Sequence, residues 1–238
     1  NILEEPDWLA KLNSLYTEEN LGLIRDYLIV HGVIDNADSL ERECFEWKIA
    51  YDNAIKGIVG DRSDELVIST LMTEKLKWPV ARLYCERYLN QNDKDRISVL
   101  IDEVISEYHG IIEEADFLTD ETKAAAISKL ETIDKQVLWP DDWSKYDSRD
   151  LEIASAADGG TLWEAVKGIV RYDTDQSIRQ FSEPVDKDWW DLVPNTFNCG
   201  YDPQSNSIWI FGAFARGDIY NAEMNDADLY ARLGMVTP

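Results

Sequence analysis

The sequence predicts a mainly α-helical protein with a small β portion. Three observations carry this prediction: apolar residues recur at helical spacing over residues 1–135, capping residues precede several of these stretches, and short strand-like runs follow residue 183. The chain has 238 residues, of which 45% are hydrophobic, and this is enough to bury a core. We therefore expect a folded chain of one large domain or two small ones.

The first helices are predicted from apolar spacing and from residues that begin or end a helix. Thr17 is a candidate N-cap of a helix that ends near His31, and Ser39 is a candidate N-cap of a second helix that ends at Gly60. Pro79 suits the first turn of a third helix. The spacing predicts that each helix buries one face and exposes the other.

The clearest helix is predicted over residues 95–115. Its apolar side chains form one stripe, opposite acidic side chains: Ile97, Leu100, Ile101, Val104, Ile105, Tyr108 and Ile112. Thr119 then caps a helix over residues 120–130, whose first turn is acidic, as the helix dipole favours. A last helix is predicted over residues 162–181.

The pattern changes after Trp139 and Pro140. Residues 141–148 are predicted to form an irregular loop held by aromatic side chains. Residues 196–201 and 207–211 read as two short strands, because they are rich in β-branched and aromatic residues and flank a turn sequence. The second half of the chain therefore supplies the β portion.

The chain is strongly acidic, with 23 basic and 47 acidic residues and a net charge of −24. Such a surface repels phosphate backbones and anionic headgroups, so we expect neither nucleic acid nor a membrane as a partner. No stretch approaches the roughly 18 apolar residues of a membrane span, and no signal peptide is visible. We therefore expect a cytoplasmic location.

The motifs of several enzyme classes are absent from the sequence. Its two histidines, His31 and His109, do not form a His-x-x-x-His pair, and no Gly-x-Ser-x-Gly, Walker or Gly-x-Gly-x-x-Gly motif occurs. His109 and Glu113, four residues apart on a predicted helix, are at most half of a metal site. Three widely spaced cysteines are typical of reduced, structural thiols.

One segment, residues 195–201, suggests binding. It places Asn198 in a predicted strand that could lie at the edge of a sheet. An extended peptide added to such an edge gains main-chain hydrogen bonds, and an asparagine side chain is both donor and acceptor. From the residues alone, an asparagine in an ordinary hairpin is the alternative.

Several segments carry motifs that occur together, in this order, in one protein family. They are residues 80–89 (Val-Ala-Arg-Leu-Tyr-Cys-Glu-Arg-Tyr-Leu), 117–126 (Phe-Leu-Thr-Asp-Glu-Thr-Lys-Ala-Ala-Ala), 139–143 (Trp-Pro-Asp-Asp-Trp), 185–190 (Val-Asp-Lys-Asp-Trp-Trp), 198–211 (Asn-Cys-Gly-Tyr-Asp-Pro-Gln-Ser-Asn-Ser-Ile-Trp-Ile-Phe) and 229–236 (Leu-Tyr-Ala-Arg-Leu-Gly-Met-Val). In these segments the sequence resembles the neprilysin family of zinc metalloendopeptidases, and bacterial, endopeptidase O-like members in particular.

The resemblance implies a two-lobed peptidase with its active site between the lobes. Residues 1–180 would belong to the helical lobe that limits which peptides enter, and residues 181–238 would begin a thermolysin-like catalytic lobe. Asn198 matches the family's asparagine that grips the substrate backbone. Cys199, where the family usually has alanine, matches the residue whose carbonyl takes part in the same strand-like pairing. We expect these two residues to bind a peptide substrate.

The resemblance also places the zinc chemistry outside this chain. In the family, residues 229–236 lead directly into His-Glu-x-x-His, so the zinc ligands and the catalytic glutamate would lie beyond Pro238. We therefore expect zinc as the cofactor of an intact enzyme that hydrolyses internal bonds of short peptides. We expect this chain to be a middle piece of that enzyme, without catalytic or metal-binding residues and inactive alone, with the catalytic remainder of the same polypeptide as its partner.

Two other functions remain open from the sequence. A non-enzymatic helical interaction module would use its acidic surface to choose basic partners. A carboxylate-based hydrolase would use some of the nine tryptophans as sugar subsites. This second alternative requires two carboxylates about 5–10 Å apart at the floor of a cleft.

Overall fold

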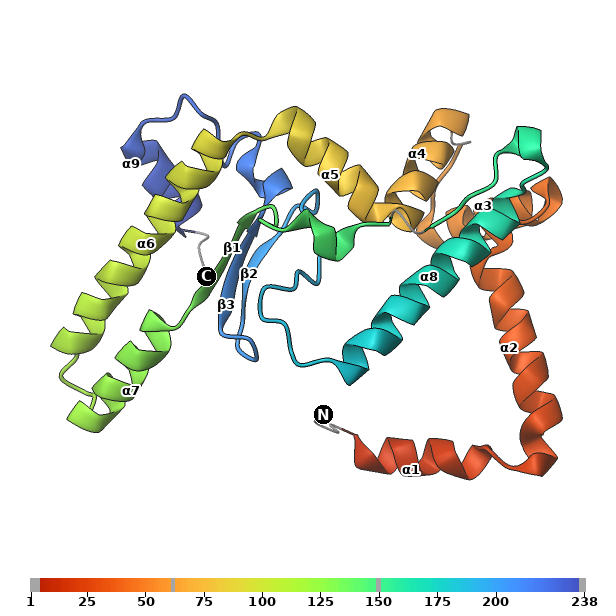
Figure 1. The fold of residues 1–238 in the computed structure, drawn as a ribbon, viewed down its shortest axis with the longest axis horizontal. Coiled ribbons are helices and arrows are strands. Elements are labelled where there is room, and N and C mark those ends of the chain that lie inside the picture. Colours follow the sequence, from red (N-terminus) through yellow and green to blue (C-terminus); the bar gives the residue numbers. More distant parts are fainter. Residues whose placement is uncertain (1–4, 61–62, 149–150, 236–238) are drawn as a thin grey trace. The chain divides into compact units, whose positions relative to one another are not determined.

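The computed structural model describes residues 5–60, 63–148 and 151–235 and shows a mainly helical fold with one small sheet (Figure 1). The predicted fold class is thus confirmed. Packing divides the chain into unit 1, Asn1–Ser63 and Ile153–Val170, and unit 2, Asp64–Glu152 and Arg171–Pro238. The division at residue 180 concerns the lobes of a larger protein and stays a prediction.

Unit 1 consists of helices. They are α1 (Pro6–Leu15), α2 (Leu21–Asp35), α3 (Arg42–Lys56) and the first part of α8 (Leu162–Ser182). The predicted helix ends were wrong here. The helix α2 continues past His31, because Val33 and Ile34 extend its apolar run and one glycine costs a helix only about 1 kcal/mol. The helix α3 ends at Gly57, whose φ of +64° suits glycine at a C-cap.

The N-cap predictions in unit 1 were also wrong. The side chain of Thr17 makes no capping hydrogen bond and precedes a short 3-10 turn. Ser39 is buried in a second 3-10 turn, and Glu41 is the residue before α3. Serine and threonine also stabilise other turns through their hydroxyl groups, so their position alone did not fix the start of a helix.

Unit 2 combines helices and the sheet. Its helices are α4 (Asp64–Lys75), α5 (Lys77–Tyr88), α6 (Gln91–Glu114), α7 (Asp120–Glu131), the rest of α8 and the short α9 (Asp226–Leu229). The predicted cap of α7 is confirmed, because the N–H of Thr122 donates to Thr119 Oγ1 at 3.2 Å. The helix α6 begins earlier than predicted, because Asn90 caps it by accepting from the N–H of Asp93.

The sheet has the order β1-β3-β2, with β1 (Asp134–Leu138) parallel and β2 (Cys199–Asp202) antiparallel to β3 (Ser207–Phe211). The two predicted strands correspond to β2 and β3, although β2 begins three residues later than expected. The strand β1 was not predicted. Its pairing with β3 joins segments about seventy residues apart, which no local pattern reveals.

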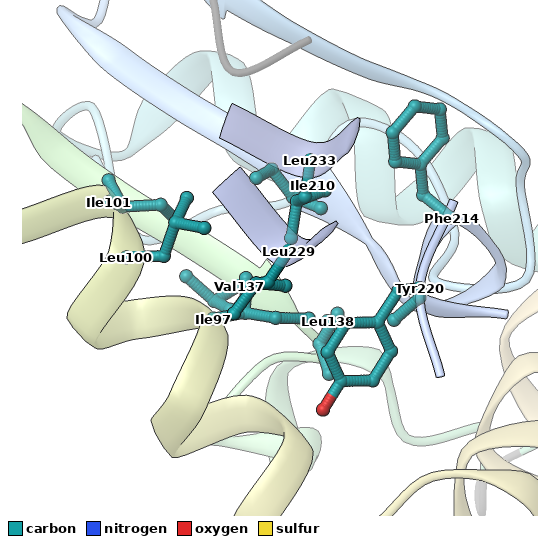
Figure 2. Packing of buried hydrophobic residues seen from close by; sticks show 11 residues of the cluster. Ile97, Leu100, Ile101, Val137, Leu138, Ile210, Phe214, Tyr220, Leu229 and Leu233 are labelled. Carbon is teal, nitrogen blue, oxygen red and sulfur yellow. The ribbon is translucent and has the colours of Figure 1, made fainter. Parts of the chain in front are cut away.

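The main core lies between one face of this sheet, α6 and the segment after residue 213 (Figure 2). Its buried members are Ile97, Leu100, Ile101, Val137, Leu138, Ile210, Phe214, Ala215, Tyr220, Leu229 and Leu233. The predicted apolar stripe of α6 supplies the first three, whereas Tyr108 is half exposed. Leu138 has a φ of +60°, which breaks the strand alternation and lets it join Val137 in the same core.

The other face of the sheet carries an aromatic cluster. Tyr146, Trp190 and Phe211 are buried there, with Trp78, Trp189 and Trp209 packed against them. The ring of Tyr146 stacks on Trp78 at a centroid distance of 3.7 Å, as expected for a loop held by aromatic residues. No helix within the described residues is long and apolar enough to cross a membrane.

Candidate functional site

The predicted binding residues lie at an edge of the sheet. Asn198 directly precedes β2, and Cys199 is the first residue of that strand. The strand β3 lies on one side of β2, and within the described part of the chain no further strand pairs with the opposite flank. The structure therefore places both residues at a strand edge, the geometry that peptide pairing requires.

The hydrogen bonding of the hairpin fixes which main-chain groups face this flank. The N–H of Phe211 donates to the carbonyl of Asn198 at 3.2 Å, so the main chain of Asn198 points toward β3. Orientation alternates along an antiparallel pair, and the main-chain groups of Cys199 and Tyr201 therefore turn toward the opposite flank. The main chain of Cys199 and Tyr201 thus lines the flank along which an added strand would run.

The side chain of Asn198 lies along the flank of β2 that is opposite β3. Its Oδ1 accepts a hydrogen bond from the N–H of Cys199 at 2.9 Å, and the residue is exposed to solvent. This contact orients the carboxamide through Oδ1, and the Nδ2 amide group keeps its capacity to donate. The side chain can therefore donate to a peptide carbonyl without first breaking its own contact.

Cys199 contributes its main chain to the flank rather than a reactive thiol. Its side chain packs against the core beside α6, and burial raises the pKa of the thiol above its usual value. A raised pKa keeps the sulfur protonated, and the thiol is a weak nucleophile in that form.

The pairing of Gly200 with Trp209 across the hairpin was not predicted from the sequence. The two residues are cross-strand partners, and a Cβ built on Gly200 would lie 2.4 Å from Cη2 of Trp209. The indole therefore lies across β2 at the glycine. The sequence did contain a signal, because the turn between β2 and β3 sets a register that pairs this glycine with a tryptophan.

A cavity of about 960 Å³ lies on the same face of the sheet as this indole, inside unit 2. Gln136 of β1, Trp209 and Phe211 of β3 and Tyr201 of β2 contribute to its lining, together with Arg179 of α8. The cavity thus combines an aromatic floor from the sheet with walls of mainly polar and charged side chains. The cavity extends to the edge strand, because residues of β2 line it.

The cavity wall formed by residues 183–192 is fixed by two contacts. Nε2 of Gln136 donates to the carbonyl of Trp189 at 2.9 Å, and Lys145 Nζ lies 2.7 Å from Asp186 Oδ2. The hydrogen bond with Lys145 lowers the pKa of Asp186, and the same contact raises the pKa of Lys145. Both groups therefore stay charged near neutral pH, and the wall stays attached to the sheet.

The segment before residue 236 is held against α6. Arg96 donates to the carbonyl of Met224 at 2.6 Å and pairs with Asp226 at 3.1 Å. The hydroxyl of Tyr220 donates to the buried carboxylate of Asp93 at 2.8 Å. The last matching residue of this segment, at position 236, lies outside the described residues.

The described residues do not fit a zinc site. No group of three or more histidine, cysteine, aspartate or glutamate side chains among them is placed to hold a metal. His109 Nδ1 and Glu113 Oε2 lie 3.7 Å apart on a solvent-accessible part of α6 and form only a pair. No catalytic step through a metal follows from these residues.

Comparisons with known proteins match nearly the whole chain. Residues 1–140 match the family described as Peptidase family M13. A neutral endopeptidase of Lactococcus lactis subsp. cremoris is 26% identical over 238 residues, which is 99% of this chain and 37% of that protein. Human neprilysin is 21% identical over 239 residues, which is 99% of this chain and 32% of neprilysin. The chain thus spans well under half the length of these relatives.

Solved structures show the same fold. The zinc metalloprotease Zmp1 of Mycobacterium tuberculosis, in complex with an inhibitor, superposes with a TM-score of 0.80 at 24% identity and covers 99% of this chain and 35% of that one. PepO from Lactobacillus rhamnosis superposes with a TM-score of 0.73 at 19% identity and covers 90% of this chain and 33% of that one. At such identities the likeness concerns the fold.

Proposed function

Because the chain belongs to peptidase family M13, the neprilysin family, we propose that it is part of a zinc endopeptidase that hydrolyses internal bonds of short peptides. The observation that carries the proposal is the edge strand β2 with Asn198 at its start. A peptide substrate is itself an extended chain and can pair with such an edge whatever its side chains are.

In this proposal Asn198 and Cys199 hold the substrate backbone. The carboxamide of Asn198 donates through Nδ2 to a peptide carbonyl, while Oδ1 keeps its contact with the N–H of Cys199. The carbonyl of Cys199, turned toward the flank opposite β3, accepts from a peptide N–H. Together these contacts fix the direction and register of the substrate and thus position one peptide bond for attack.

The zinc ligands, by the same proposal, belong to a part of the protein outside this chain. The family relationship supports a zinc-dependent reaction. This chain would contribute the substrate-pairing edge and, within residues 1–180, the helices that limit access to the active site. The test therefore needs the intact protein.

The decisive experiment replaces Asn198 by alanine in the intact protein. Loss of one or two buried hydrogen bonds, at ~1–3 kcal/mol in total, is expected to lower kcat/KM for peptide hydrolysis about 10- to 100-fold. Steady-state kinetics with an internally quenched peptide measures the change. The matched control is Asn13→Ala on α1, where the side chain is exposed and the kinetics should not change. Equal kcat/KM for Asn198→Ala and wild type would remove Asn198 from the site.

A further inference from the structure

Trp209 of β3 gives the proposed edge an aromatic surface at Gly200, where β2 itself has no side chain. The two residues are directly opposite in the hairpin, on the face away from the α6 core. A Cβ on Gly200 would lie 2.4 Å from Cη2 and 2.5 Å from Cζ2 of the indole. The far ring of Trp209 therefore occupies the space of a side chain at position 200.

Neighbouring aromatic residues hold the indole in this position. The ring of Trp209 stacks on Phe211 with centroids 5.0 Å apart and planes 28° apart, and Phe211 packs against the buried Trp190 at 5.6 Å. On the β1 side, the register partner of Trp209 is Gln136, which is tied to the carbonyl of Trp189. These contacts thus hold the indole in place, and its far ring extends toward the edge strand β2.

Part of the indole remains accessible. Trp209 is only half-buried, and it lines the cavity of about 960 Å³ that also reaches Tyr201 and Asp202 of β2. A large side chain that enters from the edge of β2 at Gly200 would meet the aromatic surface of the indole there. Small or strongly hydrated side chains gain little from such a surface.

The geometry of an added strand determines which substrate side chain meets this surface. A peptide that runs antiparallel to β2, and that pairs with the carbonyl of Cys199 and the main chain of Tyr201, places one of its residues opposite Gly200. The two form a non-hydrogen-bonded pair, in which side chains lie close together. That residue projects its side chain to the Trp209 face, because paired residues share a face. With glycine at position 200, its neighbour is the indole.

We propose that Trp209 is a specificity-determining residue, which selects a large apolar or aromatic side chain at the substrate position opposite Gly200. The proposal rests on the proposed function, since it needs a peptide paired with β2. Aromatic rings also cover cross-strand glycines simply to stabilise a sheet. The two roles of Trp209 can be told apart, because substrate selection changes the relative rates for different peptides and sheet stabilisation alone does not.

The test compares peptides on the intact protein. A quenched peptide is scanned with phenylalanine or alanine at each position, and kcat/KM is measured for each pair. Wild type should prefer phenylalanine at one position, and Trp209→Leu should lower the Phe/Ala ratio there about 3- to 10-fold, the range of an aromatic pair. Gly200→Ala should also lower this ratio, because its Cβ displaces the indole. The control is Trp163→Leu on α8, which should leave the ratio unchanged.

Each result decides the proposal. An unchanged ratio in folded Trp209→Leu, with or without a lower Tm, would overturn it and leave the indole a stabilising role only. If Trp209→Leu does not fold, the ratio measured with Gly200→Ala decides instead. A wild-type protein that cleaves peptides without preference at any position overturns the inference but not the proposed function. A wild-type protein that cleaves none overturns both.

Discussion

Gly212 lies where three parts of unit 2 meet. A Cβ at this position would lie 2.4 Å from Leu89 Cδ1, 2.9 Å from the carbonyl oxygen of Leu138 and 3.2 Å from that of Pro194. The N–H of Ala213 donates to the same Pro194 carbonyl at 2.9 Å, which holds the residue 194 loop in place. The glycine therefore allows an approach of backbone to backbone that positions the loop leading to Asn198.

We expect Gly212→Ala to destabilise the protein by ~1–3 kcal/mol, the usual cost of overpacking, because backbone oxygens cannot move aside as a side chain can. Thermal unfolding of the intact protein measures this as a lower apparent Tm. The matched control is Gly110→Ala near the C-terminal end of α6, where nothing lies within 4 Å of the added Cβ. There alanine should be neutral or stabilising by up to about 1 kcal/mol, and equal effects of the two changes would contradict this reading of Gly212.

At the scale of one element, the N-terminus of α6 shows how a helix cap becomes part of the core. Asn90 Oδ1 accepts from the N–H of Asp93 at 3.0 Å, and its Nδ2 donates to the carboxylate of Asp93 at 2.8 Å. That carboxylate is 1% exposed and also accepts from the hydroxyl of Tyr220. Burial raises the pKa of Tyr220 to about 12, so its hydroxyl remains a donor at all ordinary pH values.

We expect Asn90→Ala to cost more than removal of an exposed cap, because it leaves a buried carboxylate short of one donor. The expected loss is ~2–3 kcal/mol, against ~1 kcal/mol for Thr119→Ala at the exposed start of α7. Hydrogen exchange of the amides in the first turns of α6 and α7 measures each loss locally. Similar losses at the two helices would show that the Asp93 carboxylate does not depend on Asn90.

At the scale of the whole molecule, the sequence predicted elements that depend on local patterns better than pairings between distant segments. The α6 stripe, the Thr119 cap and the β2–β3 hairpin were predictable, because each depends on residues close in sequence. The strand β1 was not predicted, because its five residues form a strand only through β3. The role of Trp209 was missed for a similar reason, since it follows from a cross-strand register and not from the residue itself.

The apolar surface of α2 is a second property of the whole molecule. Large apolar side chains point outward on nearly every side of this helix and include Leu23, Leu28 and Ile34, which are 72%, 61% and 50% exposed. None of its residues is buried. A helix that is apolar all round is normally covered in its native protein. This agrees with a chain that spans only 37% of a relative's length.

The last prediction concerns which part of the intact protein binds the substrate and which part holds the metal. The described residues supply an edge strand, at which we propose that peptides pair, and no group of side chains fit for a metal. Binding and hydrolysis should therefore be separable. We expect the isolated 238-residue chain to hold no stoichiometric zinc at micromolar concentrations and to cleave no peptide. Metal analysis after gel filtration and a peptide-cleavage assay measure these two properties. The intact protein, treated in the same way, is the positive control and should retain zinc and activity. One tightly held zinc per isolated chain would place the metal ligands within these 238 residues and refute the division of roles proposed here.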